Sequence, residues 1–490
     1  MTASQHAEDV RRWAKRLALK GGAVVARKLS NRKPVRCDFS PAPEDSGLQP
    51  IPGDRGLPIL GHALAVATLP IEFLESRLET YGAVSWMRAF GIPFVLALGP
   101  EASREVFANN GHVFSQKGQE FFSGRFFNRG LMFLDFEEHH FHRRIMQEAF
   151  TRERLSGYVH FDGRSRWRNR GGTVRRRIAG LSIPQTHTAR HRNRRVHGRR
   201  ARTAKRPGEQ GLHRLFARRL GGGSVPGLRW SAGMRGRRAL EKYFRTNIDA
   251  RRTSGGEDLF AALCRARDED GNQFTDDDVI NHMIFLMSAA TDTSAAAATA
   301  VLHQLALHPE WQDRVRAESS AVIGDGRLDL DALDRMQSLG MVINESMRLF
   351  PPVPAICRKT LVDTSIQGYF VPADTMVVVA PWLNHYLPGL WTHAHAFDPE
   401  RFNDARREDR SHRLAFVPFG AGVHKCIGMH FATNVVKVVI HHLLRNHRIE
   451  MRSGYSLEWD LTAMPTPTDG FPVLVRRVDE SGHKNMTVST

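Results

Sequence analysis

The sequence of 490 residues is long enough to bury a large core, and its 41% hydrophobic residues predict a globular protein rather than a disordered chain. Its four cysteines include no pair at C-x-x-C spacing, which argues against a zinc finger or a disulfide framework. The formal net charge of +19 raises the question of nucleic-acid binding, but its distribution argues otherwise. Residues 160–223 alone have 18 Arg and one Lys against two acids, so the rest of the chain carries a net charge of only +2.

The first 48 residues are predicted to form a basic N-terminal arm. Basic and apolar side chains alternate there in an amphipathic pattern, namely Val10, Arg11, Arg12, Trp13, Lys15, Arg16, Leu17 and Lys20. This pattern is too polar to span a bilayer. A surface helix or a frayed end accounts for it, and a contact with a membrane surface stays open.

Residues 49–475 are predicted to form a single large domain, mainly α with a small β region, followed by a tail at 476–490. A Pro- and Gly-rich stretch from Gln49 to His62 favours an extended path, and alternating apolar residues from Ala83 to Gly99 predict a short hairpin. The later elements are a helix within 333–349, strands within 365–372 and 375–380, a helix after Cys426 and a closing strand within 470–478.

A helix of roughly 30 residues, on the order of 45 Å long, is predicted from Thr275 to Pro309. Thr275 and Asp278 resemble a capping box at its start. Residues 283–302 contain a single charge, so a transmembrane span has to be considered. We predict no membrane span, because Asp292 lies mid-helix among Ser, Thr and Ala, which lowers the hydrophobicity and marks a functional polar position. The pattern favours a central helix buried in a large core.

The sequence FGAGVHKCIG, residues 419–428, leads directly into an apolar-periodic helix. A cysteine at that place has a helix N-terminus behind it, and we expect the helix dipole and free N–H groups to lower the pKa of the Cys426 thiol. Gly422 and Gly428 remove side chains where the backbone has to approach a flat ring closely. Taken alone, a cysteine beside glycines is more often a small buried hydrophobic residue.

The complete pattern Phe-x-x-Gly-x-x-x-Cys-x-Gly resembles the haem-binding loop of the cytochrome P450 family. The resemblance implies a mainly α P450 fold in which Cys426 is the proximal ligand of a haem b iron. It also implies that Phe419 packs near the ring and sulfur, that Gly422 belongs to the haem-binding loop, and that His424 meets a haem propionate. A thiolate ligand favours cleavage of the O–O bond, which indicates oxygen activation rather than oxygen carriage.

The sequence Glu345-Ser-Met-Arg348 would, in isolation, be interpreted as a solvated pair on a helix face. It precedes Cys426 in the order of the P450 family's E-x-x-R helix, with FDPERF, residues 397–402, in between. The resemblance therefore implies a buried network of Glu345, Arg348 and Arg401 that supports the cysteine loop and takes no part in turnover.

The predicted long helix contains Ala-Ala-Thr-Asp-Thr-Ser at 289–294, which looks like the P450 motif for oxygen activation. Asp292 and Thr293 are the candidate catalytic residues, because an acid beside a hydroxyl can relay protons toward bound dioxygen. The alternative is a threonine that only bonds back to the carbonyl one turn earlier. Ala290 stands where the family commonly has Gly, so the oxygen groove is expected to be narrower or differently bent.

His139 and Arg143 are four residues apart in FEEHHFHRR and share a helix face suited to an anionic group. Alone they would be two solvated basic residues. By resemblance they match the family's propionate-binding helix, and Arg358 matches another propionate contact. Most other histidines, His393 and His395 included, are predicted to lie on the surface, and no second metal is assigned.

The basic segment 160–223 departs from the family pattern, which has amphipathic helices and a lid over the substrate there. Three interpretations compete: a basic insertion for an anionic partner, an RNA-binding arm, or a frame-shifted stretch of a GC-rich gene. We favour the last, because out-of-frame reading of Ala, Asp and Val codons gives Arg and Gly codons, and Arg exceeds Lys 18 to 1.

The predicted function is that of a haem-thiolate monooxygenase that uses dioxygen to oxidise a small, lipophilic organic substrate in the cytoplasm. Only 64 residues follow Cys426, so we expect a separate electron donor, a ferredoxin or a flavodoxin with its reductase. No nucleic-acid partner is expected. The alternatives are a P450-fold protein impaired in turnover, a peroxygenase or isomerase, and, from a different class, a basic nucleic-acid-binding protein.

Overall fold

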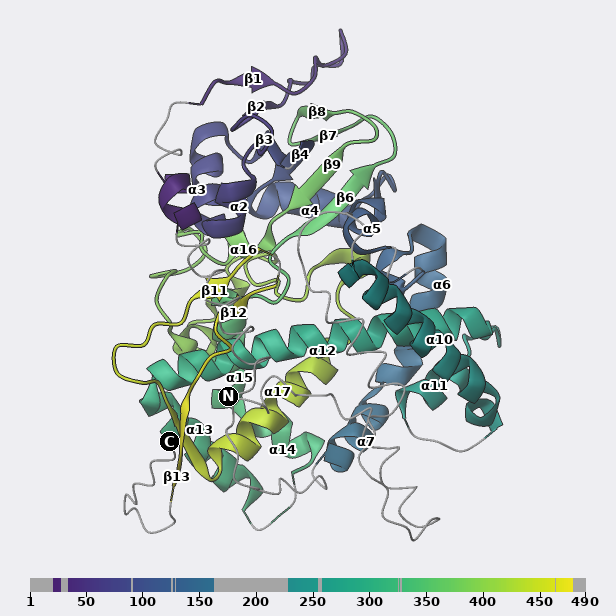
Figure 1. The fold of residues 1–490 in the computed structure, drawn as a ribbon, viewed down its shortest axis with the longest axis vertical. Coiled ribbons are helices and arrows are strands. Elements are labelled where there is room, and N and C mark those ends of the chain that lie inside the picture. Colours follow the sequence, from purple (N-terminus) through teal and green to yellow (C-terminus); the bar gives the residue numbers. More distant parts are fainter. Residues whose placement is uncertain are drawn as a thin grey trace.

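The computed structural model describes residues 21–27, 34–89, 91–124, 127, 129–162, 228–253, 258–324, 326, 328–462 and 464–478. Residues 1–20 of the predicted arm, residues 163–223 of the basic segment and residues 479–490 of the tail lie outside these ranges. The described part is mainly helical with a small β region, as predicted (Figure 1).

Helix α12, Asp276–Leu307, runs through the middle of the molecule (Figure 1). Thr275 caps it through a capping box with Asp278, as the sequence predicts, so the first free N–H groups of the helix are satisfied. The N-terminal half packs in one apolar cluster with α6, α10 and α11, and the C-terminal half packs in another with α13, α15 and α17. Two halves of the core therefore meet along a single helix.

Among the described helices, α12 alone is long and apolar enough to cross a membrane, but most of its apolar stretch is buried inside the protein. The predicted central core helix is thus present. The other labelled α-helices are α2 Ala63–Thr68, α3 Pro70–Tyr81, α4 Gly99–Ala108, α5 Lys117–Ser123, α6 Phe136–Gln147, α7 Arg152–Asp162, α10 Leu228–Thr253, α11 Leu259–Arg265, α13 Pro309–Ile323, α14 Leu330–Arg335, α15 Gln337–Leu349, α16 Pro381–Asn384 and α17 Met429–Leu444, and residues 21–27 form a further helix.

A seven-stranded sheet lies at one end of the molecule and has the order β1-β2-β3-β4-β9-β6-β5 (Figure 1). Its strands are β1 Cys37–Asp38, β2 Pro52–Asp54, β3 Val84–Ala89, β4 Ile92–Ala97, β5 Phe114–Ser115, β6 Ile356–Thr360 and β9 Met376–Val379. The predicted hairpin is the antiparallel pair β3–β4, and β9 joins it in parallel from far along the chain. The sheet thereby holds β6, which carries Arg358, in place.

Three two-stranded sheets complete the β region. They pair β7 Thr364–Ile366 with β8 Tyr369–Val371, β10 His447–Glu450 with β13 Leu474–Arg477, and β11 Trp459–Asp460 with β12 Thr466–Pro467. The predicted closing strand is β13, and the predicted helix after Cys426 is α17. This α17 packs beneath α12 (Figure 1). Cys426 lies three residues before Met429, the first residue of α17.

Candidate functional site

The loop before α17 is shaped by its glycines. Gly420 and Gly422 have φ of +71° and +68°, a backbone conformation that L side chains rarely adopt. A Cβ on Gly422 would stand 2.3 Å from the carbonyl oxygen of Phe107, so α4 presses directly on this loop. The loop closes where the Cys426 N–H donates to the Phe419 carbonyl oxygen at 2.9 Å. The backbone itself thus fixes the position of the Cys426 thiol.

The Cys426 thiol is desolvated by its surroundings, yet its surface is exposed. Burial raises the pKa of Cys426, while the Gly428 N–H and the charges of Arg143 and Lys425 oppose that rise. The expectation that the helix N-terminus lowers this thiol pKa is therefore wrong for the protein alone, because desolvation outweighs the N–H groups. A metal ion bound to the sulfur would deprotonate it.

Four basic side chains from three separate parts of the chain come together near Cys426. His139 and Arg143 belong to α6, Arg358 to β6, and His424 to the loop of residues 419–428. The imidazole rings of His139 and His424 have their centroids 3.9 Å apart. Arg143 and Arg358 both lower the pKa of each imidazole, which shows that all four groups share one neighbourhood.

Both imidazoles of this basic cluster are held neutral by burial and by the nearby positive charges. Desolvation and the two arginines lower the pKa of His139 to about 4 and that of His424 to about 2. Burial also lowers the pKa of Arg358 to about 10. Within the described residues, the buried Nδ1 atoms of His139 and His424 have no hydrogen-bond partner.

Buried imidazole atoms without partners beside two guanidinium groups call for an anionic ligand with several oxygen acceptors. The two propionate carboxylates of a haem have this chemistry, and Cys426 supplies a sulfur next to them. The residues present therefore fit a haem. The sequence prediction named all four basic residues, and the structure brings them together.

The middle of α12 provides the second part of the site. Residues 289–293 are partly exposed although the helix around them is buried. Ala289 packs against the same apolar cluster as Ile427, the residue after Cys426, so α12 passes close to the cysteine loop. Asp292 and Thr293 thus lie in the part of α12 that is not closed off by packing.

The Thr293 hydroxyl donates to the Ala289 carbonyl oxygen at 2.6 Å, which is the back-bonded arrangement that the sequence left as an alternative. Thr291 makes the same bond to Met287, also at 2.6 Å. Such bonds tend to bend a helix locally. A back-bonded hydroxyl keeps both lone pairs and can still accept a proton. The geometry is therefore compatible both with a proton relay through Thr293 and with a purely structural back-bond.

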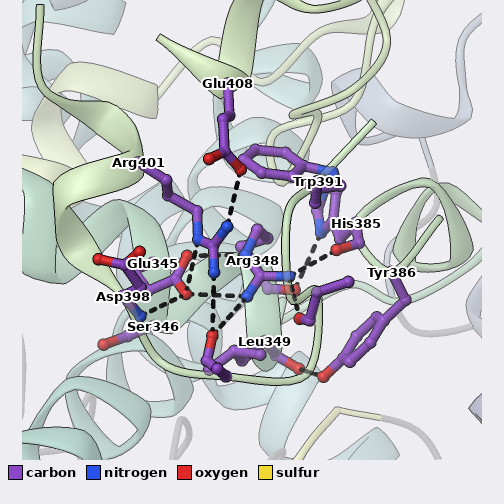
Figure 2. A network of polar contacts seen from close by, with 12 residues as sticks. Glu345, Ser346, Arg348, Leu349, His385, Tyr386, Trp391, Asp398, Arg401 and Glu408 are labelled. Carbon is purple, nitrogen blue, oxygen red and sulfur yellow. Dashed lines mark hydrogen bonds and ion pairs between the residues drawn. The ribbon is translucent and has the colours of Figure 1, made fainter. Parts of the chain in front are cut away.

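Glu345, Arg348 and Arg401 form the buried network that the sequence predicts (Figure 2). The Arg348 guanidinium donates to both carboxylate oxygens of Glu345, at 2.7 and 2.8 Å. Arg401 Nε donates to Glu345 Oε1 at 3.1 Å, and the Asp398 N–H donates to the same oxygen at 2.9 Å. All three charged side chains are fully buried.

The second arginine is balanced by an acid that the sequence reasoning missed. Arg401 Nη1 donates to Glu408 Oε2 at 2.7 Å, so the network holds two guanidinium groups and two carboxylates (Figure 2). The ring of Trp391 lies beside both guanidinium groups, with the Arg348 Cζ 5.2 Å and the Arg401 Cζ 5.9 Å from its centroid. Glu408 lies only seven residues after Arg401, but nothing in its local sequence distinguishes it from a surface acid.

His385 connects this network to the cysteine loop. The Val417 N–H donates to its Nε2 at 3.0 Å, so the proton is on Nδ1, which donates to the Arg348 carbonyl oxygen at 3.1 Å. The Val417 carbonyl oxygen in turn accepts a hydrogen bond from the N–H of Gly420, at the start of the cysteine loop. Burial lowers the pKa of His385 to about 3, which keeps the ring neutral. The sequence signal, a histidine in the apolar run PWLNHY, was present but was not used, whereas His393 and His395 are exposed as predicted.

Comparison with known proteins now decides the family. The family model for cytochrome P450 matches residues 51–161 and 235–468. The chain belongs to the cytochrome P450 family.

This P450 is 42% identical over 487 residues to cytochrome P450 136 of Mycobacterium tuberculosis, covering 93% of this chain and 94% of the relative. It is 28% identical to the cyclooctat-9-en-7-ol 5-monooxygenase of Streptomyces melanosporofaciens, over 88% and 96% of the two chains. The rat lanosterol 14-alpha demethylase is 27% identical over 83% and 84%. The solved structure of a retinoic-acid-bound cyanobacterial P450 shares the fold, with a TM-score of 0.68 over 87% of this chain and 99% of that one at 24% identity.

As a member of this family, the chain is an oxidoreductase of the monooxygenase class that works with haem iron and a cysteine thiolate ligand. Such enzymes take electrons from a redox partner and use dioxygen and an organic substrate. The fold prediction, a single mainly α domain of the P450 type, is confirmed.

Proposed function

We propose that Cys426 binds the iron of haem b and that His139, Arg143, Arg358 and His424 bind the two propionates. The observation that carries this proposal is the basic cluster itself, with its unpartnered buried imidazoles beside an exposed cysteine. Phe419 is proposed to pack near the ring and the sulfur, and Gly422 to keep the loop close to the ring plane. Haem bound here would supply the activation of dioxygen needed to insert one oxygen atom into the substrate.

The protein's own residues then handle protons. We infer that the Asp292 carboxylate takes up protons from water and that the Thr293 hydroxyl passes them on into the proposed haem-binding site. Support comes from the partial exposure of this stretch within a helix that is otherwise buried. Ala290 adds a methyl group where the family commonly has Gly, which narrows the space beside these two residues.

The substrate is proposed to be a bulky lipophilic compound that this P450 hydroxylates. Phe127, Phe133 and Phe285 form an aromatic group one turn before Ala289 of α12, with edge contacts at centroid distances of 6.0 to 6.3 Å to Phe285. Aromatic rings favour apolar ligands through the area they bury. The named substrates of two relatives, lanosterol and cyclooctat-9-en-7-ol, are lipophilic ring compounds of this kind.

The electron donor is proposed to be a separate ferredoxin or flavodoxin with its reductase, and the location to be the cytoplasm. The burial of α12, the described helix with the composition of a membrane span, supports this location. Reduction of the purified protein by a ferredoxin pair and by a flavodoxin pair, measured in parallel, identifies the donor class.

We further propose that residues 160–223 derive from a frame-shifted stretch of the gene. The family match stops at residue 161 and resumes at residue 235, which supports a local loss of the family pattern. Translation of the gene in the other two frames tests the proposal, and it fails if neither frame gives amphipathic helices. A protein with the frame restored is then the correct material for measuring turnover.

The haem assignment is tested by the ferrous carbon monoxide spectrum of purified protein with the frame restored. The red-shifted Soret band of a thiolate ligand is expected in the parent and is lost in Cys426→Ala. As a matched control, Cys357→Ala removes another thiol, one whose pKa burial raises to about 12, and leaves the band in place. Absence of the band from the parent protein would contradict the haem assignment.

A further inference from the structure

Asp135 stands at the N-cap position of α6, the helix that carries His139 and Arg143. Aspartate is favoured at this position because its carboxylate usually accepts the free N–H groups of its own helix. The Asp135 carboxylate makes no such bond. It accepts instead from the Gln116 N–H at 2.8 Å and from the Ser115 hydroxyl. The carboxylate therefore joins α6 to β5, an earlier part of the chain.

The backbone is strained where Asp135 meets α6. Phe136, the first residue of the helix, has a φ of +46°, which an aromatic residue rarely adopts. Its ring stacks on that of His112, which itself has a φ of +54°, and the two centroids are 4.7 Å apart. The Asp135 carbonyl oxygen still accepts the His139 N–H at 3.0 Å, so the helix itself begins normally. Strain of this kind persists only where surrounding contacts hold the backbone, and the bonds of the Asp135 carboxylate are such contacts.

The segment that binds the Asp135 carboxylate lies directly beside Arg358. Ser115 is fully buried, and in the pairing of β5 with β6 it stands opposite Lys359, the next residue after Arg358. A Cβ on Gly118 would be 2.3 Å from the Arg358 carbonyl carbon, so the first turn of α5 packs on the backbone of Arg358. Figure 1 shows α5 and β6 side by side. One carboxylate thus ties together two of the three parts of the basic cluster, α6 and β6.

Asp135 also balances charge in the basic cluster. Burial lowers the pKa of Arg358, and two groups oppose this effect, the Cys357 thiol and the Asp135 carboxylate. Burial raises the pKa of the Cys357 thiol to about 12, so this thiol carries no charge at neutral pH. Among the described residues, the negative charge that acts on Arg358 is therefore that of Asp135.

We propose that Asp135 is a positioning residue of the haem site, which holds α6 and β6 at the spacing their basic side chains need to bind two propionates together. This inference rests on the proposed assignment of the basic cluster to the propionates. Asp135 acts through Arg358 and His139, because a carboxylate in direct contact with a propionate would repel it. An acid with a role in its helix alone would cap that helix, as Asp329 caps α14 by accepting the Ala332 N–H at 2.7 Å.

The test uses the haem-loaded protein prepared as for the carbon monoxide spectrum. Asp135→Asn keeps an oxygen acceptor for the Gln116 N–H and removes the charge, and the Ser115 hydroxyl can turn to accept from the new amide. We expect about a tenfold higher ratio of ferrous to ferric protein at a fixed potential, because reduction adds negative charge to a site that has lost some. This change equals a rise of about 59 mV in the midpoint potential.

A second variant separates position from charge. Ser115→Ala removes one of the two hydrogen bonds to the Asp135 carboxylate and leaves its charge in place. We expect haem to pass to apomyoglobin about threefold faster, because the lost bond loosens α6 from β5, while the midpoint potential stays that of the parent. Thermal unfolding of the haem-loaded variants shows that both are folded.

Asp329→Asn is the matched control. It makes the same change at the N-cap of α14, which lies far from β6, and it is expected to alter neither the midpoint potential nor the rate of haem transfer (Figure 1). The proposal is overturned if Asp135→Asn keeps the parent's midpoint potential, or if Ser115→Ala loses haem at the parent's rate. In both of these outcomes the parent still shows the thiolate band. A parent without that band would instead contradict the haem assignment, and the role of Asp135 with it.

Discussion

Arg348 and Glu345 form a two-point ion pair with no exposed surface, joined by Nε–Oε2 at 2.7 Å and Nη2–Oε1 at 2.8 Å. Because Arg401 and Asp398 also donate to Glu345 Oε1, the carboxylate is the centre of the whole network. The remaining Arg348 donor, Nη1, is used by the carbonyl oxygens of His385 and Ala394, both at 2.6 Å. Removing the carboxylate would leave two guanidinium groups buried with insufficient negative charge.

Glu345→Ala is therefore expected to lower the free energy of unfolding by about 3–5 kcal/mol, the range measured when one partner of a buried ion pair is removed. Urea unfolding followed by circular dichroism measures this change. Glu101→Ala removes an acid from the exposed i,i+3 pair with Arg104 and serves as the control, with little change expected. Equal effects of the two substitutions would contradict a central role for Glu345.

The network shows what the sequence could predict and what it could not. Glu345, Arg348 and Arg401 could be named because their spacing and order match a family pattern. Glu408 could not be named, because its pairing with Arg401 is fixed by the path of an irregular segment that carries no periodic pattern. His385 had a signal in the apolar run PWLNHY, but its partners, the Arg348 carbonyl oxygen and the Val417 N–H, could not be predicted from it. The parallel pairing of β4 with β9 likewise joins residues almost three hundred positions apart, which local propensity does not encode.

The Cys426 thiol is an example of a wrong prediction with a clear physical reason. The sequence correctly predicts that Cys426 lies at the start of a helix, and a helix N-terminus lowers the pKa of a thiol. The depth of the site, which sequence cannot give, raises the pKa of Cys426 instead. The sign of such a shift depends on desolvation, so position along a helix is not enough to predict it.

Gly422 offers a test of the cysteine loop. Gly422→Ala introduces a Cβ 2.3 Å from the Phe107 carbonyl oxygen at a φ of +68°, so α4 or the loop has to move. We expect this variant to lose about 2 kcal/mol or more of stability and to retain less haem after gel filtration. Thermal unfolding and the ratio of Soret to protein absorbance measure the two effects.

Gly454→Ala is the matched control for this substitution. Gly454 has a similar φ of +71°, but a Cβ there would meet nothing within 4 Å. The control therefore carries the backbone strain without the clash, and it is expected to cost about 1 kcal/mol and to keep its haem. If the control loses as much haem as Gly422→Ala, strain rather than contact with α4 explains the result.

Two buried histidines make the protein sensitive to acid. His142 Nδ1 of α6 and His282 Nε2 of α12 are 2.7 Å apart, and burial lowers the pKa of both, that of His282 to about 3. Between pH 6.5 and 3 the unfolded chain therefore binds protons that the folded protein does not. Stability is complete above pH 6.5 and falls with pH below it, by about 1.4 kcal/mol per pH unit for each such histidine.

In His282→Gln the free energy of unfolding is expected to fall less steeply as the pH is lowered. The difference in slope should be about 1.4 kcal/mol per pH unit, the contribution of one histidine. The charged groups near the pair, Arg129, Glu138 and Asp278, are present in both proteins and cancel in the comparison. Urea unfolding at a series of pH values gives the two slopes. The exposed His393 changed to Gln should leave the parent slope intact, and identical slopes in parent and His282→Gln would remove this explanation.

The proposed proton path predicts a difference between two neighbouring threonines. Thr291 and Thr293 make the same back-bond at 2.6 Å, so alanine at either position removes the same structural interaction from α12. If the Thr293 hydroxyl relays protons, Thr293→Ala lowers product formation while Thr291→Ala does not, and Thr293→Ser restores it. Asp292→Asn should lower the rate about a hundredfold or more, as expected for loss of a group that transfers protons.

The variants of Thr291, Asp292 and Thr293 are best compared in protein with the frame of the gene restored and at equal haem content. A lipophilic compound that shifts the Soret band serves as the substrate. Thermal unfolding of Thr291→Ala and Thr293→Ala should agree, since the lost hydrogen bonds are alike. A solvent isotope effect on product formation that rises in Asp292→Asn would indicate that proton delivery has become slower. Equal turnover of the two alanine variants would instead leave Thr293 with the same local role as Thr291, that of bending the helix.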